Sequence, residues 1–127
     1  MMDKEMKISI CVPVYNNEKH LPYFLDSALQ QSFDDYEIIL ADNRSTDASF
    51  EILQQYAAAF PEKVSVYRAD THGGPGMGRN LAFEKSHGKY IYWCDCDDLI
   101  HPKGLEKLYE EAIKYDADIV CASAMLV

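Results

Sequence analysis

The chain has 127 residues, of which 48% are hydrophobic and 26% charged, and a formal net charge of -9 at pH 7. A chain of this length forms about one domain and buries roughly two thirds of the surface that it exposes when unfolded. The negative charge argues against non-specific binding to nucleic acid or anionic lipid through bulk electrostatics. An anionic ligand would need a local device, such as a helix N-terminus, an arginine or a bound cation.

The sequence shows neither a targeting signal nor a membrane segment. The opening residues MMDKEMK lack the apolar core of a signal peptide, and no apolar run approaches the ~18 residues of a membrane helix. The four cysteines lie in apolar, strand-like segments, which favours reduced thiols over a disulfide framework: Cys11, Cys94, Cys96 and Cys121. We therefore expect a cytoplasmic protein, with no membrane association visible in this chain.

Strands and helices are predicted to alternate along the chain. Apolar, β-branched runs predict strands at residues 7–14, 36–42, 64–69 and 89–95, and a fifth strand starting at residue 117. Between them, a short helix is expected at 79–85, and apolar residues recur at helical spacing in three further groups: Leu21, Phe24, Leu25, Ala28 and Leu29; Phe50, Leu53, Ala57 and Phe60; Leu105, Leu108, Tyr109, Ala112 and Ile113. Ser45–Asp47 can cap the second helix, and Pro102 stands where the last one can begin. The alternation predicts one α/β domain, a three-layer sandwich with a mainly parallel sheet.

Polar residues follow each of the first four predicted strands. These loops read YNNE (15–18), DNRSTD (42–47), DTHGGPG (70–76) and DCDD (95–98). Ligands of parallel α/β sheets bind beyond the carboxyl ends of the strands, so the four loops should form one ligand-binding rim. A single polar loop could simply be solvated, but four at the same edge favour a site.

The glycine-rich segment at 72–78 does not fit the two best-known nucleotide motifs. Its glycines are spaced differently from G-x-G-x-x-G, because residue 79 is arginine, and the segment follows the third strand rather than the first. The sequence also contains no G-x-x-x-x-G-K-[ST] motif. A Rossmann dinucleotide site and a P-loop are both excluded.

Two long segments resemble the N-terminal half of the inverting family-2 glycosyltransferases. They run from ISICVPVYNNE to FEIL (8–53) and from GGPGMGRN to DCDDLIHP (73–102). The resemblance implies the GT-A fold and transfer of a sugar from a nucleoside diphosphate-sugar, here expected to be a UDP-sugar, to a hydroxyl of a glycan or lipid-linked acceptor in glycan or polysaccharide synthesis. It also implies that residues 1–127 form an incomplete donor-binding domain whose acceptor half is not present. The general base is then expected beyond residue 127, with no catalytic residue within 1–127.

Asp95-Cys96-Asp97, followed by Asp98, matches the family's D-x-D motif. The resemblance implies that Asp95 and Asp97 hold Mn²⁺ or Mg²⁺ on the donor's diphosphate. Oxygen ligands suit these cations independently of the resemblance, since they typically bind one or two carboxylates together with substrate phosphates. In an extended chain Asp95 and Asp97 would point to one side and Asp98 to the other. Two alternatives stay open: an acidic cluster favoured by the dipole of the following helix, and a weakly indicated C-x-C zinc site at Cys94 and Cys96.

The other predicted donor-binding residues match family positions one at a time. Asp42 would accept the imide N–H of uracil, Tyr15 would pack beside the base, and Arg79 would face the nucleotide. The remaining residues assigned to the donor by the resemblance are Pro13, Asn16, Glu18 and Asp95. The alternatives are an Asx turn at Asp42, a buried structural role for Tyr15 and a salt bridge for Arg79 to the acidic rim.

The motif beginning at Asp42 departs from the common family pattern D-D-G-S-T-D. It reads D-N-R-S-T-D here, with Asn43 and Arg44 in place of an acid and a glycine. Because of these two differences, the resemblance does not settle which base the donor carries or which conformation this loop adopts. A non-catalytic nucleotide-sugar binding module remains the alternative function. A nucleotidyltransferase is less well supported, because YNNEKH after the first strand lacks a glycine-rich signature.

Overall fold

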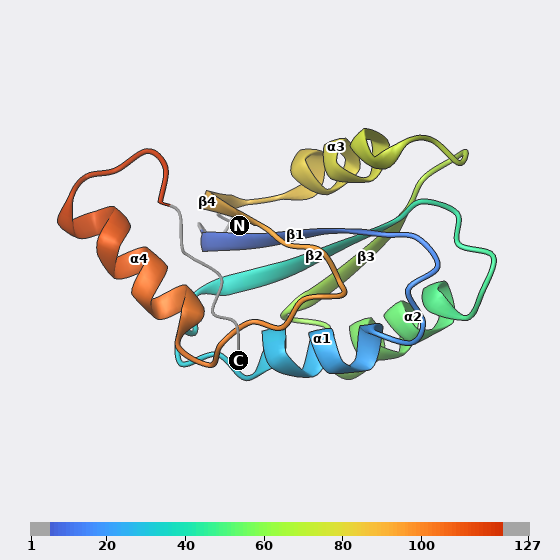
Figure 1. Ribbon diagram of the computed structural model, residues 1–127, viewed down its shortest axis with the longest axis horizontal. Coiled ribbons are helices and arrows are strands. Elements are labelled where there is room, and N and C mark those ends of the chain that lie inside the picture. The colour runs from blue at the N-terminus through green and yellow to red at the C-terminus, as the bar shows by residue number, and fades with distance from the viewer. Residues whose placement is uncertain (1–5, 121–127) are drawn as a thin grey trace.

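The computed structural model describes residues 6–120 and contains a four-stranded parallel sheet (Figure 1). The sheet order is β3-β2-β1-β4, and each strand is followed by a helix. The strands are β1 (Met6–Val14), β2 (Tyr36–Asp42), β3 (Val64–Arg68) and β4 (Gly88–Trp93). The helices are α1 (Leu21–Leu29), α2 (Ser49–Ala59), α3 (Pro75–Lys85) and α4 (Gly104–Lys114).

The sheet lies between two helical layers. Helices α1 and α2 cover one face and α3 the other, while α4 lies beside the sheet (Figure 1). Alternate residues of β1 and β2 supply the two cores: Ile10 and Ile38 pack on the larger, α1 side, whereas Cys11 and Ile39 belong to a smaller cluster with Ala82 of α3. Because both faces are buried, these strands read as continuous apolar runs. The predicted three-layer α/β sandwich is confirmed.

Two predicted boundaries are wrong. Helix α3 begins at Pro75 rather than at Arg79, so most of the glycine-rich segment is helical. Proline fits this position, because the first turn of a helix needs no N–H from it and its fixed φ is already helical. Strand β4 ends at Trp93 instead of Asp95, since its last paired residue is Trp93, opposite Cys11 of β1.

Gly78 allows α3 to approach the sheet closely. A Cβ atom at this position would lie 3.0 Å from Cβ of Pro13, at the end of β1. This distance is tighter than ordinary van der Waals contact, so a larger residue would push α3 away from the strand. Gly78 therefore helps to fix the helix next to the polar edge of the sheet.

Two predicted apolar positions are largely exposed. Phe60 is 44% exposed and Ile113 is 50% exposed, although Leu53 and Leu105 of the same stripes are fully buried. Phe60 lies just after the end of α2, which explains why it leaves the helical face. The predicted fifth strand falls mainly on residues 121–127, outside the described residues, and residues 117–120 form no strand.

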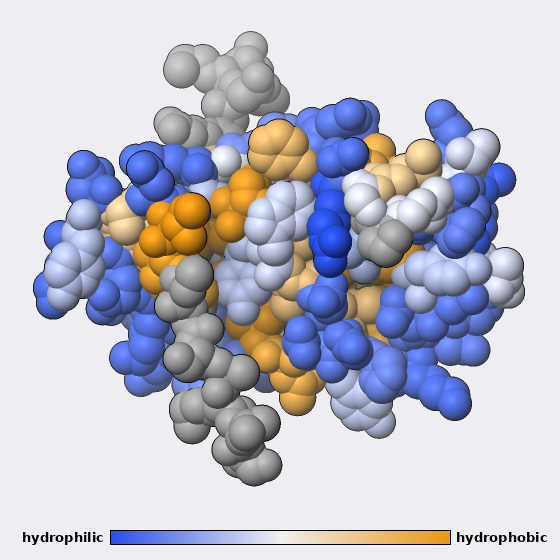
Figure 2. Space-filling model, turned by 45° about the horizontal axis from the view of Figure 1, so that its top comes forward, coloured by the Kyte–Doolittle hydropathy of each residue, from blue (hydrophilic) through white to orange (hydrophobic). Residues whose placement is uncertain are grey.

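A hollow of about 700 Å³ lies between β4 and α4. Apolar side chains gather on this part of the surface, amid a largely hydrophilic surround (Figure 2). Its lining includes Tyr90, Tyr92, Leu108 and Tyr109, and none of the predicted site residues. None of the helices among residues 6–120 has the length and hydropathy required of a membrane span.

Candidate functional site

The loops after β1 and β2 are held together by Asn16. Its Oδ1 accepts hydrogen bonds from the N–H groups of Thr46 (2.8 Å) and Asp47 (3.4 Å), and its own N–H donates to Ser45 Oγ (3.0 Å). The backbone of Asn16 has a φ of 50°, in the left-handed region that asparagine tolerates better than most residues. Asn16 was predicted to bind substrate, and the structure shows that its side-chain oxygen joins two loops.

Asp47 supports the same junction. Its carboxylate accepts hydrogen bonds from the N–H groups of Ser49 (2.8 Å) and Glu18 (3.3 Å). Burial alone would raise the pKa of Asp47, but the hydrogen bonds from Ser49 and Glu18 outweigh it and lower the pKa. Asp47 is therefore a carboxylate at neutral pH. The predicted capping segment does act at the start of α2, although Ala48 is the N-cap residue and makes no side-chain cap.

Asp42 is fully buried at the end of β2. Its carboxylate accepts hydrogen bonds from the Ser45 N–H (3.1 Å) and the Ser45 hydroxyl (2.5 Å), which together form an Asx-type turn. Arg68 Nε lies 3.3 Å from Oδ2 and supplies the positive charge that a buried carboxylate needs. The turn left open as an alternative is thus present, and the contact of Asp42 with a nucleobase stays a prediction.

Tyr15 stands at the rim beside His72. The tyrosine is 43% exposed, so the alternative of a buried structural tyrosine is wrong. The two rings lie 4.6 Å apart between centroids and are tilted by 47°. Nδ1 of His72 is 3.0 Å from the carbonyl oxygen of Asn43, which fixes the ring from the other loop. The loops after β1, β2 and β3 therefore meet at this aromatic pair, and the partly buried Pro13 stands two residues before Tyr15 in the chain.

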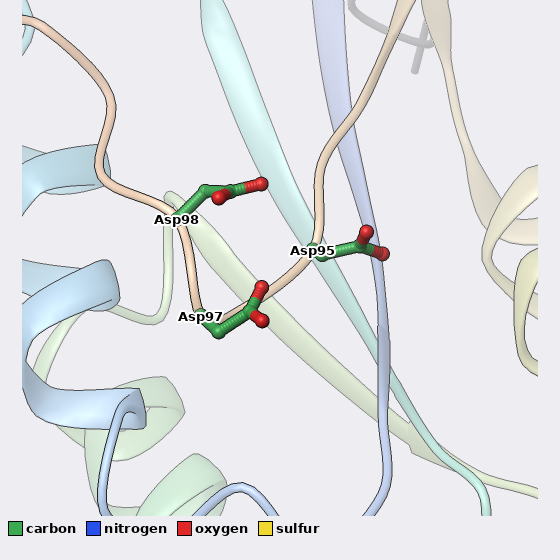
Figure 3. A group of neighbouring side chains, drawn as sticks. All are labelled: Asp95, Asp97 and Asp98. Carbon is green, nitrogen blue, oxygen red and sulfur yellow. The ribbon is translucent and has the colours of Figure 1, made fainter. Parts of the chain in front are cut away.

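Three carboxylates lie near one another after β4 (Figure 3). Asp95, Asp97 and Asp98 each place one carboxylate oxygen within 4.8 Å of an oxygen of the other two. All three residues are exposed. The chain turns here, because the Asp98 N–H donates to the Asp95 carbonyl (3.1 Å). The expectation that Asp98 points away from Asp95 and Asp97 is therefore wrong, since it assumed an extended chain.

The acidic group is separate from the helix that follows it. Helix α4 begins at Gly104; its N-cap residue Lys103 makes no side-chain cap, and the Leu105 N–H in its first turn donates to Gln31 Oε1 (3.1 Å). Residues 99–103 separate Asp98 from that first turn, and the helix dipole acts mainly within the first turn. Helix capping, the alternative explanation for these acids, is therefore not supported.

Arg79 of α3 lies next to the acidic group. Its Nη2 is 3.9 Å from Oδ1 of Asp95, and the two side chains are 49% and 61% exposed. The salt bridge left open as an alternative is thus present, at the limit of ion-pair distance. Because both groups face solvent, the pair is weak and leaves the guanidinium available to a ligand.

The cysteines next to the acidic group are poor metal ligands. Burial, together with the nearby carboxylates, raises the pKa of both Cys94 and Cys96 to about 12. Among residues 6–120, the group of side chains close enough to share a metal ion consists of Asp95, Asp97 and Asp98, and neither cysteine belongs to it. A zinc site at these cysteines is not supported, and the oxygens of Asp95, Asp97 and Asp98 form the better donor set for a hard cation such as Mg²⁺ or Mn²⁺.

Residues 9–127 match the family described as glycosyl transferase family 2. The chain belongs to this family. The predicted family and transferase class are confirmed.

Several named glycosyltransferases are similar to this chain. It is 41% identical over 116 residues to a poly(ribitol-phosphate) beta-glucosyltransferase of Bacillus spizizenii, covering 90% of this chain and 18% of the relative. It is 34% identical to the glycosyltransferase GlyG of Streptococcus pneumoniae, covering 89% of this chain and 37% of the relative. The chain thus spans well under half of these relatives.

Solved structures show the same fold. The structure of Staphylococcus aureus TarS 1-349 in complex with UDP superposes with a TM-score of 0.82 at 31% identity, covering 89% of this chain and 34% of that one. A Pyrobaculum calidifontis mannosyltransferase in complex with GDP-Man and Mn²⁺ matches with a TM-score of 0.75 at 22% identity, covering 91% of this chain and 33% of that one, which supports the fold alone. The predicted GT-A fold is confirmed.

Three contributors to the site were missed in the sequence. Arg68 neutralises Asp42, His72 packs on Tyr15, and Asn43 contacts the segment before α3. Each of these residues stands in a loop or at a strand end on the predicted polar edge. That position alone does not indicate which residue each of them contacts. Asn43 had been noted only as a departure from the family pattern.

Proposed function

We propose that this chain is the donor-binding part of a metal-dependent inverting glycosyltransferase that uses a UDP-sugar and a hydroxyl acceptor of a glycan or polysaccharide. The observation that carries the proposal is the cluster of Asp95, Asp97 and Asp98, with the Arg79 guanidinium 3.9 Å from Asp95. A cation held by carboxylates and an arginine beside it form a site for a diphosphate. The similarity to TarS, whose structures contain UDP or UDP-GlcNAc, supports a uridine nucleotide.

The exposed residues of the rim have distinct roles in this proposal. Arg79 binds a diphosphate oxygen, and the Tyr15 ring packs against the base, next to His72. Pro13, Asn16 and Glu18 shape the β1 loop that borders the nucleotide. Asp42 keeps the β2 loop folded through Ser45 and Arg68, and we propose that it acts on the donor through this loop rather than by the untested base contact predicted from the sequence.

The reaction exchanges one bond at the anomeric carbon for another. The acceptor oxygen forms a bond to that carbon while the bond to the diphosphate breaks, and the diphosphate leaves with the electron pair. Mn²⁺ or Mg²⁺ bound at Asp95 and Asp97 would neutralise the charge of the diphosphate. Arg79 adds a second positive group on the same side. The acceptor's proton passes to a general base that we assign to no residue of 1–127.

Thermal and chemical unfolding with nucleotides tests this proposal. UDP with Mn²⁺, at about one hundred times its Kd, should raise the free energy of unfolding by about 2.7 kcal/mol. Most of this gain should vanish when a chelator removes the metal, because the diphosphate then faces unneutralised carboxylates. Screening UDP, GDP, ADP and CDP, each with Mn²⁺ and with chelator, compares the bases directly. Equal stabilisation by UDP in both conditions would remove the metal from the proposal.

The alternative is a non-catalytic nucleotide-sugar binding module. It predicts the same stabilisation by UDP and Mn²⁺, so binding alone does not separate the two functions. Hydrolysis or transfer of radiolabelled sugar by the full-length protein separates them. A full-length protein that binds the donor and releases no UDP with any hydroxyl acceptor would favour the binding module.

A further inference from the structure

The side-chain amide of Asn43 joins the end of β2 to the segment that leads into α3. Its Nδ2 donates to the carbonyl oxygen of Gly73 (2.6 Å) and more weakly to that of Gly74 (3.4 Å). Its Oδ1 accepts from the N–H of Gly73 (3.0 Å). The residue is only 5% exposed, so these bonds are shielded from water.

The main chain of Asn43 is fixed as well. Its N–H donates to the carbonyl of Val14 (2.8 Å), at the end of β1, and its carbonyl oxygen is 3.0 Å from Nδ1 of His72. The single residue therefore contacts the ends of β1 and β2 and the loop after β3. A side chain anchored in this way has little freedom to turn elsewhere.

This pair of bonds requires an amide. An amide offers a donor and an acceptor at the same end of the side chain, whereas an ionised carboxylate only accepts. A carboxylate at this position could accept from the Gly73 N–H, but its second oxygen would face the Gly73 carbonyl at about the present 2.6 Å. Two buried acceptors facing each other without a proton are unfavourable, so the glycine segment would move away.

The clamped glycines directly precede α3. Gly74 is the N-cap residue of that helix, and Arg79 follows on its second turn. The Arg79 side chain is half exposed, and its ion pair with Asp95 is long, so the path of the helix rather than side-chain packing determines where the guanidinium lies. We infer that Asn43 is a positioning residue, whose amide holds the start of α3 and thereby places Arg79 beside the acidic group.

Asn43→Asp gives a test with its own pH signature. At about pH 7.5 the introduced carboxyl is ionised and cannot donate, but at about pH 5 its protonated form regains a donor and an acceptor. Facing the Gly73 carbonyl raises the pKa of such a group, so the defect is present above that pKa and is lost as the pH falls through it. Asn43→Ala cannot be rescued in this way. Asn80→Asp, on the exposed surface of α3, controls for the added charge.

Two measurements on the 127-residue chain separate the clamp from ligand binding. Hydrogen-exchange protection of residues 73–79, without ligand, should fall at least about tenfold in Asn43→Asp at pH 7.5 and recover toward pH 5, with Asn80→Asp unchanged. The affinity for UDP with Mn²⁺ should fall by a similar factor, and Asn43→Asp should add little loss in an Arg79→Ala background.

Each result bears on one step of the inference. Unchanged protection in Asn43→Asp at pH 7.5, or a defect with no pH dependence, would overturn the amide clamp. Lost protection with unchanged UDP affinity would overturn its link to Arg79. The affinity measurement rests on the proposed function, but the protection measurement does not. If the parent chain fails to bind UDP, the proposed function fails and the protection data still decide the clamp.

Discussion

The guanidinium of Arg79 lies 3.9 Å from the carboxylate of Asp95 and brings one positive charge to a group of three acids. The two residues come from different elements, since Arg79 lies on α3 and Asp95 follows β4. Both side chains are about half exposed, so water weakens their attraction. Opening this ion pair would therefore lower the stability of the fold only slightly. Both the guanidinium and the carboxylate are available to a charged ligand.

Arg79→Ala should separate stability from binding. An exposed ion pair contributes about 0.2–1 kcal/mol, so the free energy of unfolding without ligand should change by no more than that. The affinity for UDP with Mn²⁺ should fall about tenfold or more, because a charge-assisted hydrogen bond to a diphosphate contributes roughly 1.5–3 kcal/mol. Urea unfolding and calorimetric titration measure the two effects. Lys107→Ala on α4 is a control that removes a positive charge elsewhere, and equal UDP affinities of parent and Arg79→Ala would exclude the phosphate contact.

Arg44→Gly should stabilise the protein. Arg44 has a φ of 61°, which costs a residue with a Cβ about 1–2 kcal/mol, and glycine adopts this conformation without that cost. Allowing for the greater chain entropy of glycine, we expect a gain of about 0.5–1 kcal/mol in urea unfolding. Arg44→Ala is the matched control: it removes the same side chain, including the 3.5 Å contact with the Ala69 carbonyl, and keeps the unfavourable φ. Equal stabilities of the two variants would show that φ is not the cause.

Asp42→Asn should lower stability rather than change base preference. The amide loses the charge that faces Arg68 and weakens the bonds from Ser45, so we expect a loss of roughly 1.5–3 kcal/mol in the free energy of unfolding. Because Asp42 is fully buried, the affinities for UDP and GDP should fall by the same factor. Titrating both nucleotides against parent and variant checks this. A loss confined to UDP would instead establish the base contact predicted from the sequence.

The sequence predicted the sheet well because both of its faces are buried. Ile10, Ile38 and their neighbours form continuous apolar runs, which are typical of buried strands. Because these strands alternate with amphipathic helices, the sequence also predicts that they pair in parallel. The rim was predicted at the level of loops, since parallel strands deliver their carboxyl ends to one edge. The roles proposed for Asp95, Asp97 and Arg79 come from the family resemblance.

The remaining features depend on contacts between distant segments. Nothing near Asp42 in the sequence indicates that Arg68, 26 positions later, would neutralise it. The turn that brings Asp98 toward Asp95 follows from the end of pairing at Trp93, which local alternation does not show. In the sequence, Asn43 is notable only because it replaces an acid of the family pattern. In the structure, its side-chain amide bonds both the carbonyl oxygen and the N–H of Gly73.

Asp97→Ala should abolish the effect of Mn²⁺ on UDP binding while leaving the fold intact or slightly more stable. Asp95, Asp97 and Asp98 repel one another without a cation, so removing one carboxylate relieves repulsion in the apo state. The same change removes an oxygen ligand for which a hard cation has few substitutes here. Melting temperatures with chelator, and with Mn²⁺ plus UDP, should therefore show no decrease in the first condition and a lost ligand shift in the second. Glu110→Ala, on the exposed side of α4, removes the same charge and should keep the full shift. If Asp97→Ala melted lower in chelator and kept its ligand shift, the acids would be structural and the cation site would have to be abandoned.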